Sequence, residues 1–291
     1  MAVEERDWAK LPRNVLMLTF CKLGMHQVLL RASSVCKPWR EVAKNPTLWR
    51  RIDMGMSIRC FRRICKLREE NSIVDATPLM RAIGTEMTKV AVKWGGNCVE
   101  QLLIGPACDA NLFNYVADRA RNLKSLSIID NRAFCNVENM AKTLGQLKQL
   151  EELSIVRCTT PSGMMMKVVG TKCPQLKRLK IINPFWSGTF TTWEEGTSTQ
   201  LGIPEPMLQL EVLQLVLTST TTVELMKIVE RCPNLEILDL RSSPVQVTND
   251  DIRNRCSKLH TLILPHDIFS QARNQYCDHY GDMYTTKPLI I

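Results

Sequence analysis

One stretch of the chain gathers residue types that often do chemistry. Residues 35–52 read VCKPWREVAKNPTLWRRI and hold one cysteine, two tryptophans and five Lys/Arg. Cations interleaved with exposed aromatic rings would bind single-stranded nucleic acid. A cysteine beside cations could be a reactive thiolate or a metal ligand. The third possibility is an apolar protein-binding surface with a charged rim.

The spacing within this stretch favours the apolar surface. Val35, Trp39 and Val42 recur at intervals of four and three residues, which predicts one face of a helix. A base-stacking ring should instead stand among the charges on an exposed face. We therefore interpret the lysines and arginines as a solvated or partner-facing rim and predict no nucleic-acid partner.

Other reactive groups are sparse. The chain has four histidines, none in a His-x-x-x-His pair, and it lacks a glycine-rich phosphate loop and a nucleophile elbow. Cys277, Asp278 and His279 are adjacent, so their side chains do not face one another on a helix or strand. The twelve cysteines include no C-x-x-C pair. We predict a protein that is not an enzyme and holds neither a metal nor a cofactor.

The charge of the chain is concentrated at its N-terminal end. Residues 1–70 contain 15 Lys/Arg against 7 Asp/Glu, and the remainder contains 23 against 22. This asymmetry predicts an acidic partner for the N-terminal module. No apolar run reaches the roughly 18–20 residues that span a bilayer, and the N-terminus does not resemble a secretory signal. We expect a protein of the nucleus, the cytoplasm or both, without a membrane partner.

The larger part of the chain is a repeat. The pattern is an apolar residue, two residues, Leu, one residue, and Leu or Ile, and successive copies start 24, 27, 26, 34, 25 and 24 residues apart. The last two apolar positions of each copy are two residues apart, which places them on the same side of a strand. Seven copies begin at Val99, Leu123, Leu150, Leu176, Leu210, Leu235 and Leu259.

Between the copies lie segments such as 137–144 and 223–230, with apolar residues at helical spacing. A strand and a helix cannot bury their apolar faces alone, whereas stacked copies can. The pattern resembles leucine-rich repeats. The predicted fold is α/β: a short all-helical module followed by a curved solenoid, with parallel strands on the concave face and helices outside.

The repeat register accounts for three cysteines. Cys173, Cys232 and Cys256 each stand three residues before the start of a copy, where other copies hold Ala120 and Leu147. A position that accepts Cys, Ala or Leu is a packing position, at which reduced cysteine acts as a small hydrophobic residue.

The strand residues between the inward positions form a column that could bind a target. The 34-residue step adds a segment, 183–206, with four aromatic residues and three prolines. This segment is either a surface loop whose rings pack on the solenoid or a loop that binds a partner. Candidate target-binding residues are Ser127, Ser154, Arg178, Lys180, Phe185, Trp186, Trp193, Gln214 and Asp239.

The N-terminal module reads as three short helices. The first begins near Pro12 with Val15, Leu16, Leu18 and Leu23 as its expected apolar face, and Gly24 ends it. The others cover MHQVLLRAS and SVCKPWREVAKN. About forty residues in short helices make a poor core, so we expect this module to complete its core against a partner.

These residues also carry a family resemblance. LPRNVL…VLLRASSVCKPWREVAKNPTLWRRIDM resembles an F-box in its Leu-Pro opening, its Val-Cys-x-x-Trp helix and its Pro-x-Leu-Trp ending. It departs from the family pattern at Thr19 and His26, where aliphatic residues are usual. With the repeats behind it, the chain resembles plant F-box/leucine-rich-repeat proteins.

That resemblance implies a substrate-recognition subunit of an SCF-type cullin-RING ubiquitin ligase. The F-box would dock the Skp adaptor and through it the cullin, and the repeats would bind a protein target whose identity stays open. Leu48 and Trp49 would seat the F-box on its linker. The implied adaptor-facing residues are Leu11, Pro12, Val15, Leu16, Leu29, Val35, Cys36 and Trp39. The alternatives are a leucine-rich-repeat scaffold outside a ligase and a nucleic-acid-binding module.

The resulting domain prediction has four parts. Residues 8–54 form the F-box, and 55–97 form a helical linker or degenerate first repeat with helices near 62–70 and 80–93. Residues 98–266 form the repeats, and 267–291 form a tail.

Overall fold

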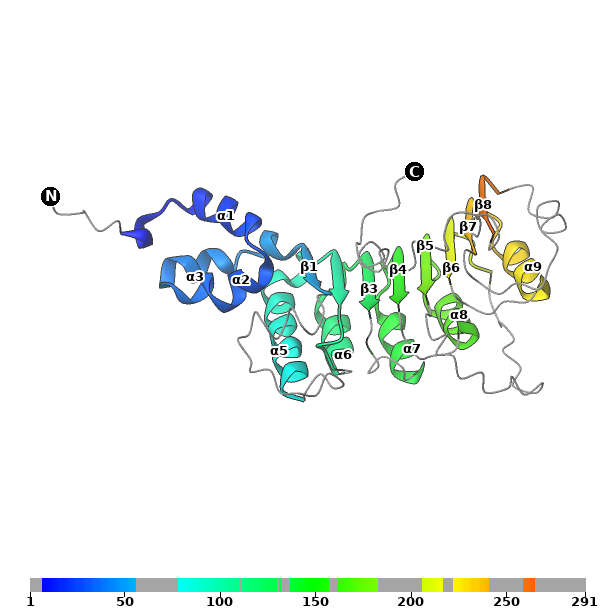
Figure 1. Ribbon diagram of the computed structural model, residues 1–291, viewed down its shortest axis with the longest axis horizontal. Helices are drawn as coiled ribbons and strands as arrows, with labels where there is room; N and C mark the ends of the chain where they lie inside the picture. Colours follow the sequence, from blue (N-terminus) through cyan, green and yellow to red (C-terminus); the bar gives the residue numbers. More distant parts are fainter. Residues whose placement is uncertain are drawn as a thin grey trace, which may run out of the picture. The chain divides into compact units, whose positions relative to one another are not determined.

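The structure is a computed structural model (Figure 1). It describes residues 7–55, 78–109, 111–129, 131, 137–156, 162–182, 206–216, 222–240 and 259–264. The chain divides into two compact units. The first comprises Met1–Phe134 and Lys142–Leu150, and the second comprises Cys135–Ala141 and Glu151–Ile291. The predicted helix near 62–70 and the predicted tail lie outside the described residues.

The N-terminal module is helical, as predicted. Pro12 precedes α1 and its carbonyl accepts the first helical hydrogen bond, from the backbone N–H of Leu16 at 3.1 Å. Gly24 occupies the cap before α2. The elements are η1 Trp8–Lys10, α1 Arg13–Lys22, α2 Met25–Leu30, η2 Ala32–Ser34, α3 Lys37–Ala43 and η3 Pro46–Trp49.

The buried face of α1 differs from the prediction. Leu16 and Phe20, four residues apart, are the buried pair. Val15 and Leu18 are exposed on another side of the helix. Because α1 carries apolar residues on two faces, its sequence could not decide which face the rest of the module covers.

Helix α3 is shorter than predicted. It begins at Lys37, with Cys36 at its N-cap and Pro38 in its first turn, where the missing N–H of proline costs nothing. Val35 therefore precedes the helix and is exposed, whereas Val42 is buried. The prediction that Val35, Trp39 and Val42 share one face of a helix was therefore wrong for Val35, which lies outside α3.

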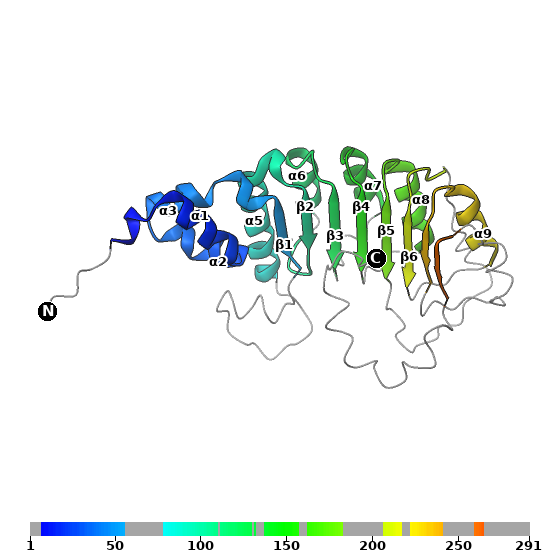
Figure 2. The same cartoon turned by 90° about the horizontal axis from the view of Figure 1, so that it is seen from above.

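In the first unit, three parallel strands lie side by side in sequence order, with two helices along one side of the sheet (Figures 1 and 2). The predicted helix 80–93 is confirmed as α5, and Gly96, at φ +51°, supplies the left-handed residue that turns the chain toward the next strand. The elements are β1 Arg51–Met54, α5 Pro78–Gly95, η4 Gly96–Cys98, β2 Gln101–Ile104, α6 Asn111–Arg119 and β3 Ser125–Ile129.

Strand β1 belongs to the repeat, although it lies inside the predicted F-box. Its Arg51 pairs with Gln101 of β2. The carbonyl of Arg50 accepts the backbone N–H groups of Glu100 and Gln101, as the carbonyl of Glu100 accepts those of the next repeat. The sheet therefore begins at Arg51 and not after residue 98. Trp49-x-x-Ile52-x-Met54 has the spacing of the repeat pattern but departs from it at both of its last two apolar positions, with Ile in place of Leu and Met in place of Leu or Ile.

In the second unit, five parallel strands follow one another in sequence order, and helices lie along one side of them (Figure 2). Helix α7, Val137–Gln146, runs through the division between the units. The remaining elements are β4 Glu152–Val156, α8 Ser162–Lys172, β5 Arg178–Ile182, β6 Val212–Val216, α9 Thr222–Arg231, β7 Ile237–Asp239 and β8 Thr261–Ile263. The parallel-strand sheet with helices confirms the predicted α/β repeat architecture.

The packing positions before the strands are confirmed where the structure describes them. Cys173 and Cys232 are buried, as are their equivalents Ala120 and Leu147. The backbone carbonyl at each of these four positions accepts a hydrogen bond from the N–H of the apolar residue that starts the repeat, three residues later in the chain. Burial raises the pKa of Cys232 to about 11, so this thiol stays protonated and unreactive. Cys256 lies outside the described residues.

The described residues contain neither a cluster of metal-ligating side chains nor a helix able to span a membrane. No group of three His, Cys, Asp or Glu side chains among them is arranged to hold a metal ion. None of the helices there combines the length and apolar character that crossing a membrane requires.

Candidate docking surfaces

Exposed apolar side chains gather in the N-terminal module. Eight large apolar side chains are exposed in the part of the chain that the structure describes, and only Leu79 and Leu208 of these lie beyond residue 35. Exposed apolar groups concentrated in one small module are typical of modules that bind another protein. The other six are Trp8, Val15, Leu18, Leu23, Leu30 and Val35.

Trp39 links the elements that carry these exposed side chains. The Trp39 ring packs edge-on against Phe20 with a centroid distance of 5.6 Å. Its indole Nε1 donates to the backbone carbonyl of Trp8 at 2.9 Å, which holds η1 against α3. Trp39 is therefore half-buried and contributes support as well as surface.

The predicted adaptor-facing residues do not all face outward. Leu16 is only 1% exposed, so its side chain belongs to the module's core and cannot contact a partner; that part of the prediction was wrong. Leu29 is half-buried and lines a groove against α5. Val15 and Val35 are exposed. Of the others, Pro12 is exposed, while Leu11 and Cys36 are half-buried.

The module is strongly basic. Residues 8–55 contain nine Lys/Arg against two Asp/Glu, a net charge of +7. One of the two acids, Glu41, bonds to Lys44 at 2.8 Å, and that hydrogen bond lowers the pKa of its carboxyl. The apolar surface is therefore set in a positive field that attracts an acidic partner.

Trp49 seats the module on the first repeat. Its side chain is 2% exposed, and its indole Nε1 donates to the carbonyl of Ala43 at 2.7 Å. Its ring packs edge-on against Trp94 of α5, with centroids 5.5 Å apart. The contact agrees with the predicted role of Trp49. Because the same residue leads into β1, the F-box and the first repeat share one core.

His26, a departure from the family pattern, makes the stability of this module depend on pH. It is buried in α2, and burial lowers its pKa from the ordinary 6.5 while the charge of Asp53 acts in the opposite direction. The unfolded chain therefore binds a proton at a higher pH than the folded chain does. The stabilisation is complete above about pH 6.5 and is lost as the pH falls toward the lower folded pKa.

We expect the urea-unfolding free energy of the intact chain to fall between pH 7.5 and 5.5, and to fall less in His26→Gln. Both proteins keep their carboxylates ionised through most of this range, so the difference between them isolates the imidazole. An equal decline in both proteins, or greater stability of the parent chain at pH 5.5, would contradict this assignment.

The predicted column on the sheet follows the observed strand register. Ser154 pairs with Lys180, Lys180 with Gln214, and Gln214 with Asp239. In the first unit Ser127 pairs with Leu103. The repeat spacing thus placed these residues correctly along the strands.

Two residues of this column cannot serve as a binding surface. Gln214 is 7% exposed and Asp239 is 1% exposed. The Gln214 Nε2 donates to the Asp239 Oδ2 at 3.0 Å, so both side chains are part of the interior. Their prediction as target-binding residues was wrong, because strand alternation places a side chain on one face of the sheet without deciding whether that face is covered.

The other predicted target-binding residues divide into two groups. Arg178 is exposed, and its Nε donates to Glu152 on the neighbouring strand at 2.6 Å. Ser127, Ser154 and Lys180 are half-buried. The aromatic candidates Phe185, Trp186 and Trp193 lie outside the described residues.

Comparison with known proteins supports the family resemblance. The model of the F-box-like family matches residues 8–55. Putative F-box/LRR-repeat protein 23 of Arabidopsis thaliana is 31% identical over 265 residues, which is 90% of this chain and 54% of that protein. Putative F-box/LRR-repeat protein 22 of the same plant is 29% identical over 90% of this chain and 78% of its own length. Putative F-box/LRR-repeat protein 9 of Arabidopsis thaliana is 29% identical over 81% of this chain and 88% of its own length.

The chain thus spans about half the length of the first of these relatives and most of the other two. A solved structure of a Bacteroides fragilis protein shares 16% identity over 64% of this chain and 61% of its own, with a TM-score of 0.39, a likeness too weak to bear on the fold. The family prediction is confirmed by the sequence relatives: the chain carries an F-box-like domain at residues 8–55 and is homologous over most of its length to F-box/LRR-repeat proteins of Arabidopsis thaliana.

Proposed function

We propose that the protein is a non-catalytic substrate-recognition subunit of an SCF-type cullin-RING ubiquitin ligase. Its F-box docks the Skp adaptor, and through the adaptor the cullin, while its repeats hold a protein target. The observation that carries the proposal is the gathering of exposed apolar side chains within the segment that matches the F-box-like family. Such an assembly would work in the nucleus, the cytoplasm or both.

In this role the chain supplies geometry. A receptor that holds the adaptor at one site and the target at another turns ubiquitin transfer into a reaction between neighbours, which raises its rate without any reactive group of the receptor. The close union of F-box and first repeat through Trp49 suits this role, because a firm seat limits how far the bound adaptor can move relative to that repeat.

The adaptor would contact Val15 and Leu18 of α1 together with Val35, which precedes α3. These side chains are 42%, 65% and 56% exposed. Apolar anchors at the centre of an interface carry most of the binding energy, while rim charges mainly guide association. The module's positive charge then favours an adaptor surface that is apolar with acidic surroundings.

The target would bind the strand surface of the repeats. The support comes from the second unit, where Arg178 and Lys180 lie on β5 as an exposed and a half-buried cation and Ser154 is half-buried on β4. A surface of this polarity suits a protein target.

The test is capture of a purified Skp adaptor by the intact chain and by the double variant Val15→Asp/Val35→Asp. Each substitution would place a carboxylate in an apolar contact, so we expect binding about 100-fold weaker or worse. Leu208→Asp is the matched control, since it puts the same charge on an exposed leucine of the second unit. Circular dichroism and melting temperature establish that all variants are folded.

The outcomes distinguish the alternatives. Equal capture by the double variant and the control would overturn the proposed docking surface. If the intact chain recovers neither adaptor nor cullin from cells, a scaffold outside a ligase is favoured. Retention of bulk nucleic acid at moderate salt, lost on neutralising the module's cations, would favour a nucleic-acid-binding module.

A further inference from the structure

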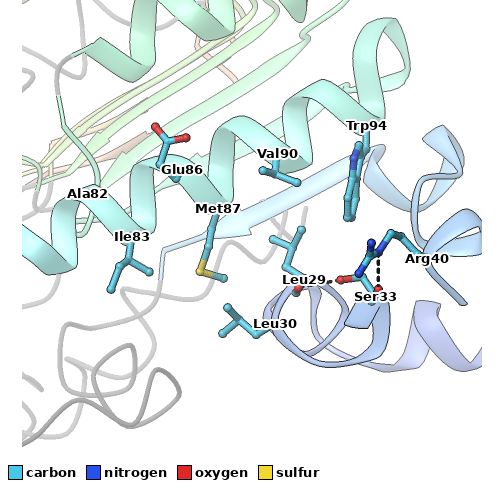
Figure 3. Close-up of a pocket in the computed structure, with 10 residues that line it drawn as sticks. All are labelled: Leu29, Leu30, Ser33, Arg40, Ala82, Ile83, Glu86, Met87, Val90 and Trp94. Atoms are coloured by element: carbon cyan, nitrogen blue, oxygen red, sulfur yellow. Dashed lines mark hydrogen bonds between the residues drawn. The ribbon is translucent and has the colours of Figure 1, made fainter. Parts of the chain in front are cut away.

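A groove of about 600 Å³ lies within the first unit, between the F-box helices and α5 (Figure 3). One wall comes from α2, η2 and α3, and the other from a single side of α5. The volume falls in the range of small-molecule sites, which are mostly apolar with a few fixed polar groups and are common where two structural modules meet.

The groove has apolar walls on both sides. Ile83, Met87, Val90 and Trp94 follow one another along α5 at helical spacing and point into it (Figure 3). Leu29 faces them from α2, beside Leu30. On this side of α5, Met87 is buried, while Ile83 and Val90 are half-buried at the groove.

Arg40 is the cation that lines this groove. Arg40 is an exposed residue whose Nε donates to the backbone carbonyl of Ser33 at 3.0 Å, which orients the guanidinium. This bond uses one of its five N–H donors. The Ser33 hydroxyl donates to the carbonyl of Leu29 at 2.9 Å, so its own hydrogen is already engaged.

The two charged side chains that line the groove, Glu86 and Arg40, differ in their partners. The acidic lining residue, Glu86, forms an ion pair with Lys89, whose Nζ donates to the carboxylate at 2.7 Å. Glu86 and Arg40 lie at opposite ends of the groove, with Arg40 at the end of Trp94 (Figure 3). Glu86 and Trp94 are eight residues apart, which is about 12 Å along the helix axis. An elongated ligand would meet a cation at one end and apolar walls along its length.

We propose that this groove binds an apolar carboxylic acid. The carboxylate accepts hydrogen bonds from the free guanidinium donors of Arg40, and the hydrocarbon chain lies between Leu29 and the Ile83, Met87 and Val90 side of α5. Arg is well suited to this task, because its planar guanidinium matches the two oxygens of a carboxylate. The bound acid touches both the F-box and the first repeat, so it strengthens their union. The groove shares Leu30 with the exposed apolar set of the module, but none of Val15, Leu18 and Val35, the side chains proposed to contact the adaptor, lines it.

The experiment is calorimetric titration of the intact chain with decanoate below its micelle concentration. Decan-1-ol and decyltrimethylammonium serve as probes with the same chain and a neutral or cationic head. We expect saturable one-to-one binding of decanoate, at least tenfold tighter than that of decyltrimethylammonium. Decanoate should also raise the melting temperature, because it binds only the folded state.

Variants assign the site. Arg40→Gln should weaken decanoate at least tenfold and leave decan-1-ol unchanged, whereas Lys37→Gln, an exposed cation of the same helix outside the groove, should leave both unchanged. Ile83→Glu should weaken both probes, and Leu79→Glu, an exposed leucine of α5 outside the groove, should weaken neither.

Arg40→Lys separates ligand binding from support of Ser33. It loses the Nε bond and keeps the charge, so it should retain a preference for decanoate over decyltrimethylammonium that Arg40→Gln lacks. Absence of saturable binding, equal affinity for the three probes, or equal effects of Arg40→Gln and Lys37→Gln would each overturn the proposal.

Discussion

Trp49→Ala should lower the free energy of unfolding of the first unit by about 3–5 kcal/mol, the usual cost of removing a large buried aromatic side chain. The substitution would empty the space between η3 and α5, remove the edge-on contact with Trp94, and leave the carbonyl of Ala43 without its indole donor. Because Trp49 stands two residues before β1, the loss should also loosen the pairing of β1 with β2.

Urea unfolding followed by circular dichroism measures this effect, and hydrogen exchange of the β1 amides locates it. Trp8→Ala is the matched control, since Trp8 is 56% exposed and its truncation should cost less than about 1 kcal/mol. A Trp49→Ala variant as stable as the control would show that the F-box and first repeat do not share a core. Because β1 spans Arg51–Met54, deleting residues 8–54 would remove the first strand of the sheet as well as the F-box.

Asp239→Ala should lower the free energy of unfolding by about 1–3 kcal/mol, the cost of leaving a buried polar group without its partner. The variant would orphan the Gln214 amide, which is buried and donates to Asp239. Any loss of target capture should follow this loss of stability, because neither side chain reaches the surface.

Asp239→Asn is expected to lose less than Asp239→Ala, since its side-chain carbonyl can still accept from Gln214. Glu230→Ala removes an exposed acid at the end of α9 and should change stability by less than about 0.5 kcal/mol. A fully stable Asp239→Ala protein that fails to capture its target would instead restore Asp239 to the binding surface.

The sequence by itself determined the repeat and its register. Side chains alternate along a strand with a period of two, so a one-residue slip would turn every inward leucine outward. The pairing of Leu179 with Leu213 and of Leu213 with Leu238 is therefore implicit in the spacing. The buried positions of Cys173 and Cys232 followed from the same register.

The tertiary structure decided which apolar residues are covered and which are left for a partner. Val15 and Leu16 are neighbours of similar hydrophobicity, yet Val15 is exposed and Leu16 is buried on the same face of α1 as Phe20, whose ring packs against Trp39 of α3. In the sequence, Trp49 belongs to the Pro-x-Leu-Trp ending of the F-box motif. In the structure, its contact with Trp94 of α5 also makes it part of the core of the first repeat.

Burial of polar residues and the groove beside Arg40 were also beyond the sequence. Gln214 and Asp239 are polar residue types that suggest a surface column, yet both are buried, and their mutual hydrogen bond helps to satisfy these polar groups in the interior. The groove joins Leu29 and Arg40 to Val90 through contacts between segments some fifty residues apart in the chain. Local periodicity states which residues share a face of one element, whereas exposure depends on what the rest of the chain brings against that face.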